Sequence, residues 1–153
     1  MLSENDRAKI SDLITLYSFA WDAADADGFA DLFIDDAVCV FYLNGAAEPA
    51  SELRGKESMR KAAIERAGYF KKIGLVTKHF MPNSVITGVD EVTAHVKTQA
   101  LITWQMLAKE AAPQPVQAGY YESVVTKSPE GWKFVSREVR LNGVFNVKEV
   151  YER

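Results

Sequence analysis

Apolar residues near the amino terminus recur every three or four positions, the spacing of one face of an α-helix. This apolar stripe consists of Ile10, Leu13, Ile14, Tyr17, Ala20, Trp21 and Ala24. Ser3 precedes the stripe as a suitable N-cap, and Glu4 and Asp6 interact favourably with the positive end of a helix dipole. The pattern therefore predicts an amphipathic first helix that begins after Ser3 and ends before Asp25.

Two more helices are predicted before the middle of the chain. Residues 28–33 form a short apolar segment that ends before Asp35. Residues 56 to about 72 form a longer one, with Gly74 as its stop. Near one face of this longer helix lie Met59, Ala62, Ala63, Ala67 and Phe70.

The remaining segments alternate in polarity and are rich in Val and aromatic residues, which is typical of strands. The predicted strands are residues 37–43, 46–53, 78–87, 91–108, 117–127 and 131–146. Asn44 and Gly45 form a turn, and residues 109–117, with Pro113 and Pro115, form a loop. Helices followed by long strands predict an α+β fold in which a curved sheet wraps around the helices and leaves one end open.

Composition limits the class of protein. The chain has 153 residues, 48% of them hydrophobic, and a net charge of -3, which fits one globular domain over residues 1–153. Cys39 is the sole cysteine and the charged start is no secretory signal, so we expect a cytoplasmic protein. No apolar run reaches the roughly 20 residues of a membrane span. Scattered basic residues do not favour nucleic acid as a partner.

The chain offers few metal ligands or cofactor motifs. His79, His95 and Cys39 are the nitrogen and sulfur ligands, and they do not have zinc-site spacing. No glycine-rich phosphate loop follows any predicted strand. We therefore expect chemistry that needs no cofactor and no metal.

The first helix and the predicted strands carry several polar residues that are candidates for a functional site. Tyr17 and Asp22 lie about 140° apart around an ideal helix, so helical spacing alone does not direct both to one point. Periodicity alone favours a core tyrosine at position 17 and a solvated helix-end acid at position 22 over a paired site. His79 opens a strand, where histidines often have structural roles, whereas His95 alternates with polar neighbours and is expected to be exposed.

The last predicted strand carries Arg137 and Arg140. Their odd spacing places them on opposite faces of a regular strand, so at most one of them points inward. The pattern does not decide which of the two arginines points inward.

Several short motifs occur in an order that resembles a known family. They are Tyr17 to Asp22, Asp31-Leu32-Phe33, Asp35-Asp36-Ala37-Val38, Leu53-Arg54-Gly55-Lys56-Glu57-Ser58-Met59, Thr77-Lys78-His79-Phe80 and Gly131-Trp132-Lys133-Phe134. Over nearly the whole chain they resemble the SnoaL-like family of the nuclear transport factor 2-like superfamily. The resemblance implies a cone-shaped α+β barrel with a deep pocket at its open end.

Within that superfamily the sequence is most similar to scytalone dehydratase, bile acid 7-alpha-dehydratase and hexachlorocyclohexane dehydrochlorinase, which eliminate water or HCl without a cofactor. The resemblance implies an Asp-His dyad of Asp22 and His79, with Tyr17 and Arg137 as further catalytic residues. His79 would remove a proton from carbon in a dehydratase-like lyase reaction, although cyclase and isomerase chemistry begin in the same way. The positions that steroid isomerases and epoxide hydrolases use hold no suitable acids.

Aromatic residues make up 11% of the chain, which favours an apolar aromatic or polycyclic ligand. The candidate pocket residues are Phe33, Phe41, Phe70, Phe80, Met81, Trp104, Met106, Tyr121 and Phe145.

The superfamily also contains proteins without catalytic activity. Ligand carriers, assembly scaffolds and small subunits of ring-hydroxylating dioxygenases share the fold, so a binding or assembly module is the alternative function. The resemblance further implies a homodimer or homotrimer, with Val92, Ala94, Val96 and residues 99–107 as its expected face.

Overall fold

Seven strands form one strongly curved sheet in the computed structural model, which describes residues 1–152. The strands are β1 (Phe33–Leu43), β2 (Ser51–Arg54), β3 (Leu75–Phe80), β4 (Ser84–Gly88), β5 (Thr93–Met106), β6 (Gln114–Ser128) and β7 (Gly131–Gly143). Their order is β2-β1-β7-β6-β5-β3, and β4 pairs with β5 outside this path. The sheet is mixed because β1 and β7 are parallel, whereas the other pairs are antiparallel.

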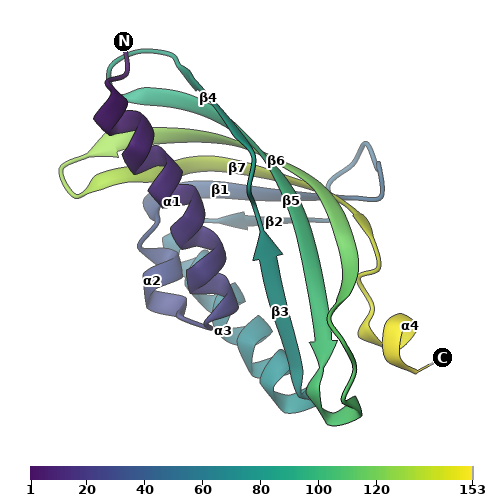
Figure 1. Ribbon diagram of the computed structural model, residues 1–153. Coiled ribbons are helices and arrows are strands. Elements are labelled where there is room, and N and C mark those ends of the chain that lie inside the picture. Colours follow the sequence, from purple (N-terminus) through teal and green to yellow (C-terminus); the bar gives the residue numbers. More distant parts are fainter. Residues whose placement is uncertain (153) are drawn as a thin grey trace.

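Three helices cover the concave side of this sheet, namely α1 (Glu4–Asp22), α2 (Ala26–Ala30) and α3 (Lys56–Ile73). A short fourth helix, α4 (Val147–Tyr151), follows β7. Figure 1 shows α1 lying across the sheet, with α2 and α3 beside it and α4 beyond the end of β7. The α+β architecture expected from the sequence is therefore confirmed. No helix in the described part of the chain is long and apolar enough to cross a membrane.

The first and third predicted helices are confirmed at both ends. Ser3 caps α1, and its Oγ accepts a hydrogen bond of 3.1 Å from the backbone N–H of Asp6. Gly74 ends α3 in the left-handed conformation, with φ of 68°. The second helix is shorter than predicted and begins earlier. Asp25 caps it through the N–H of Gly28, while Phe33 belongs to β1 and pairs with Phe134.

Some strand predictions need correction. The segment predicted as one strand over residues 78–87 is two strands, because Pro82 has no N–H to donate to a sheet. The predicted loop at residues 109–117 is reduced to residues 110–113, since β6 already begins at Gln114. The predicted 46–53 strand is reduced to β2, and α4 lies where no helix was predicted.

A bulge in β7 changes which of its side chains face inward. Phe134 pairs with Val125 and Ser136 pairs with Val124, so Val135 is an extra residue. Trp132 and Phe134 are buried before the bulge, and Arg137, Val139 and Leu141 are buried after it. The inward positions therefore pass from even to odd numbers, and this shift buries Arg137 and leaves Arg140 on the outer face.

Asp6 connects the start of α1 to strands β6 and β7. Its carboxylate accepts hydrogen bonds from Ser3 Oγ at 2.6 Å and from the buried Trp132 Nε1 at 3.1 Å. Lys127 Nζ lies 2.9 Å from the same carboxylate. These partners, led by the Ser3 hydroxyl, hold the pKa of Asp6 well below its usual range.

The oligomer face expected from the sequence needs correction at Ala94 and Val96. Ala94 and Val96 are buried on the concave side, because the inward residues of this strand are the even-numbered ones. Val92 and Leu101 are exposed, as is His95, which was expected to be so.

We predict that Asp6→Asn lowers the free energy of unfolding at pH 7. Because the pKa of Asp6 is depressed in the folded state, its carboxylate stabilises the fold above the unfolded pKa of about 4, and this contribution is lost as pH falls. Urea unfolding at pH 7 and pH 3 should show a difference between wild type and variant that shrinks at pH 3. Asp12→Asn, at an exposed position of the same helix, is the control. An equal difference at both pH values would contradict the prediction.

Candidate active site

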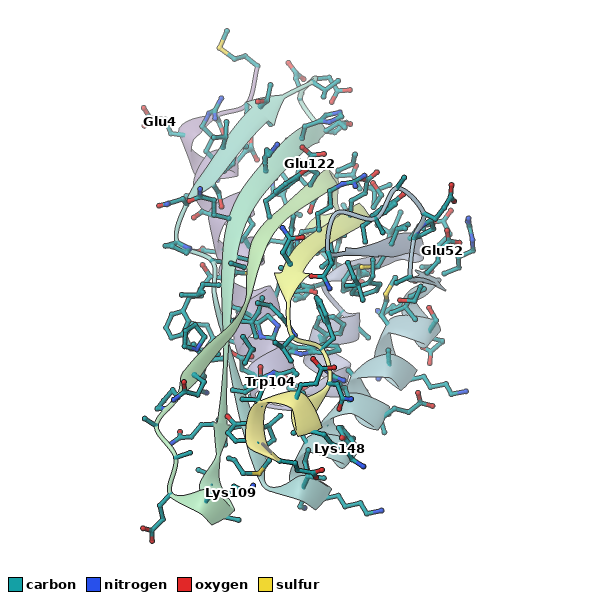
Figure 2. All side chains as sticks on the ribbon, turned by 90° about the vertical axis from the view of Figure 1, so that its right-hand side faces the viewer. Glu4, Glu52, Trp104, Lys109, Glu122 and Lys148 are labelled. Atoms are coloured by element: carbon teal, nitrogen blue, oxygen red, sulfur yellow. The ribbon has the colours of Figure 1, made fainter. Side chains whose placement is uncertain are left out.

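The concave side of the sheet and the helices enclose a cavity of about 580 Å³. Its walls are mostly apolar, which is typical of a site for a small organic molecule. The aromatic lining residues are Tyr17, Trp21, Phe29, Phe41, Tyr69, Phe70, Trp104, Tyr121 and Phe145. Trp104 is buried in the interior, near the middle of the view in Figure 2, whereas Lys109 lies at the lower end of the molecule.

Five of the nine candidate pocket residues line this cavity, namely Phe41, Phe70, Trp104, Tyr121 and Phe145. The other four do not. Phe80 is 52% exposed, because successive side chains of β3 face opposite sides and His79 already faces inward. Phe33 is buried beneath the cavity against Phe29 and Phe134. Met81 and Met106 pack in the core away from the cavity lining.

Asp22 and His79 form the polar centre of the site. Asp22 Oδ1 lies 2.7 Å from His79 Nδ1, and Asp22 Oδ2 accepts a hydrogen bond of 2.8 Å from the backbone N–H of His79. A carboxylate can only accept here, so Nδ1 carries the proton and the lone pair of the neutral ring is on Nε2. His79 lines the cavity, and its ring meets Trp21 edge-on at 6.5 Å.

Two tyrosines face the same cavity. The rings of Tyr17 and Tyr121 meet edge to face, with centroids 5.9 Å apart. Burial raises the pKa of Tyr17 to about 12 and that of Tyr121 well above its usual value, and burial outweighs the opposing effect of nearby Arg137. Both side chains are therefore neutral hydroxyls at pH 7 and can donate hydrogen bonds.

Arg137 is buried behind these tyrosines and does not line the cavity. Its guanidinium carbon lies 4.0 Å from the ring centroid of Tyr17 and 4.6 Å from that of Tyr121. Nη1 donates to Ser123 Oγ at 3.0 Å, whereas Nε and Nη2 have no partner among the described residues. Arg137, which the family resemblance implied as a catalytic residue, therefore does not reach the cavity, and its guanidinium packs on the rings of Tyr17 and Tyr121 instead.

Several polar residues of the cavity were not singled out from the sequence. Thr77 precedes His79 by two positions on the same face of β3, and its Oγ1 has no partner among residues 1–152. Gln117 donates from Nε2 to the carbonyl of Val144 at 2.7 Å. Strand alternation from His79 would have found Thr77. Arg66 also lines the cavity, four residues before Phe70 on the predicted inner face of α3.

Among residues 1–152, no group of three or more His, Cys, Asp or Glu side chains is arranged to hold a metal ion. Cys39 lines the cavity as a free thiol, and burial raises its pKa to about 12.

We predict that Phe41→Ala weakens binding of an apolar ring compound, and that Phe80→Ala does not. 2-Naphthamide is a suitable probe, with isothermal titration calorimetry as the measurement. Loss of the Phe41 ring removes apolar contact from the cavity wall and should raise Kd by about tenfold, whereas Phe80 faces away from it. Equal Kd values for the two variants would contradict this assignment of the wall.

Comparison with known proteins identifies the family. Residues 3–138 match the sequence profile of the SnoaL-like domain, so the chain belongs to the SnoaL-like domain family. No curated protein sequence matches the chain at a significant level.

Solved structures share the fold at low sequence identity. A "putative scytalone dehydratase" from Novosphingobium aromaticivorans has 23% identity and a TM-score of 0.71, with 91% of this chain and 84% of that chain covered. The beta subunit of a "putative aromatic-ring-hydroxylating dioxygenase" from the same species has 17% identity and a TM-score of 0.74, with 90% of each chain covered. A protein of unknown function with a cystatin-like fold from Nostoc punctiforme has 16% identity and a TM-score of 0.69, with 92% and 93% covered.

Proposed function

We propose that this protein is a cofactor-independent lyase of the dehydratase type, with His79 as its general base. The observation that carries the proposal is the pair of hydrogen bonds from His79 to Asp22 at the wall of an apolar cavity. They leave Nε2 as the unprotonated nitrogen of the neutral ring. A base fixed in this way can take a proton from carbon in a site that excludes much of the bulk water.

The proposed reaction removes water from a cyclic alcohol. His79 Nε2 takes a proton from a carbon next to an activating carbonyl, and the electrons of that C–H bond form the new double bond. The neighbouring C–O bond breaks with its electron pair on oxygen, which takes a proton from the His79 imidazolium and leaves as water. His79 then returns to its starting state, so protons and electrons balance without a co-reactant.

In this proposal, the tyrosines stabilise the negative charge that develops on a substrate oxygen during the reaction. Tyr17 is a neutral donor in the cavity and would hydrogen-bond to the carbonyl or to the leaving oxygen. Arg137 is a positioning residue in this scheme, because its guanidinium packs on the Tyr17 and Tyr121 rings and counteracts the rise of their pKa values.

A screen for activity should begin with 3-hydroxy-1-tetralone, because its C2–H is acidified by the carbonyl and loss of the C3 hydroxyl yields fluorescent 1-naphthol. Other hydroxylated or halogenated cyclic compounds with an acidic C–H follow. Binding of ring compounds without any turnover across this panel would favour the alternative, a ligand-binding or assembly module.

We predict that His79→Gln lowers turnover of the best substrate by roughly 10² to 10⁴-fold, the usual contribution of a general base. The matched control is His95→Gln, which replaces the other histidine at an exposed position. Circular dichroism should show that both variants unfold at temperatures close to that of wild type. Turnover by His79→Gln at the wild-type rate would exclude the proposed base.

We predict that Tyr17→Phe lowers kcat by about 10- to 100-fold with a smaller effect on KM, because the donor acts on charge that develops during reaction. Phe keeps the ring that packs on Arg137 and Phe29. A variant with wild-type kcat would show that Tyr17 serves only to pack the core.

A further inference from the structure

Arg66 differs from Lys56 and Arg60, two other basic residues of α3, because it has no carboxylate partner among the described residues. Lys56 pairs with Asp31, and Arg60 pairs with Asp27 and Glu57. Arg66 forms no ion pair with any carboxylate among residues 1–152, and it donates no hydrogen bond to a described residue. A half-buried guanidinium whose donors have no partner among the described residues can bind an anion.

The guanidinium of Arg66 is held in place by an aromatic ring. Its Cζ lies 4.3 Å from the ring centroid of Phe70, one turn further along the helix. Stacking of this kind restricts the plane of the guanidinium, while the N–H groups at its edge stay available for a planar anion. Burial lowers the pKa of Arg66, and the nearby Tyr69 phenol opposes this effect without reversing it.

Arg66 and Phe70 both line the cavity that contains His79. Arg66 is the only permanently charged cation among the described residues of the lining. The acidic residue beside it, Glu65, also lines the cavity, but its side chain is mostly exposed and its Oε1 lies 3.9 Å from Lys61 Nζ. With Tyr69 also exposed, this stretch of α3 forms a wall near solvent.

We propose that Arg66 binds the carboxylate of an apolar, ring-containing molecule whose ring occupies the cavity. A carboxylate matches the two parallel donors of a guanidinium edge, and the aromatic walls receive the ring. The binding site does not depend on the proposed function. The assignment of the bound molecule as the substrate does rest on it.

The test compares two inert probes of nearly equal shape, 2-naphthoate and 2-naphthamide, by isothermal titration calorimetry at low salt. Wild type should bind the carboxylate at least tenfold more tightly than the amide, since a hydrogen bond between charged groups contributes that much or more. Arg66→Gln should bind both probes equally. Arg66→Lys keeps the positive charge but loses the two parallel N–H donors of the guanidinium. It should therefore prefer the carboxylate by less than wild type does.

A further variant makes the result specific. Lys72→Gln removes one positive charge from an exposed position of the same helix and should keep the full preference. The proposal is overturned if wild type binds neither probe or shows no preference, if Arg66→Gln keeps the preference, or if Lys72→Gln loses it. Failure of the lyase proposal would appear separately, as an absence of His79-dependent turnover while the preference persists.

Discussion

The Asp22 carboxylate, at the end of α1, accepts hydrogen bonds from two atoms of His79 in β3 and so joins the helix to the strand. It accepts from both the ring and the backbone of His79, so it fixes the strand and the side chain together. Asp22 is the last residue of α1, where the negative end of the helix dipole disfavours a carboxylate. The two donors of His79 offset this cost, and the position of the ring in the cavity depends on them.

The other end of α1 is fastened in a comparable way by Asp6, which binds Trp132 of β7 and Lys127 of β6. Between these two anchors, Tyr17 is presented to the cavity. The curved sheet supplies the opposite wall. Its β7 bulge buries Arg137 behind Tyr17 and Tyr121, so a positive charge packs against the two phenol rings and does not line the cavity.

The helical periodicity of the sequence was enough to predict α1 and α3, because apolar stripes and end signals such as Ser3 and Gly74 are local. The family motifs placed Asp22 and His79 in one site. Periodicity alone could not, since their contact joins two distant segments. The face of Arg137 depends on the extra residue Val135, and a bulge has no clear sequence pattern. Phe80 was assigned to the pocket on its aromatic character, although strand alternation beside His79 already excluded it.

The most direct test of the account is the protonation of the His79 ring, measured by long-range proton–nitrogen correlation NMR on uniformly labelled protein. The exposed His95 provides an internal reference for a ring without a buried partner. The account predicts that neutral His79 carries its proton on Nδ1, facing Asp22, and that Nε2 has the shift of an unprotonated nitrogen. A proton on Nε2 of the neutral ring would contradict it, because no lone pair would then remain for proton abstraction in the cavity.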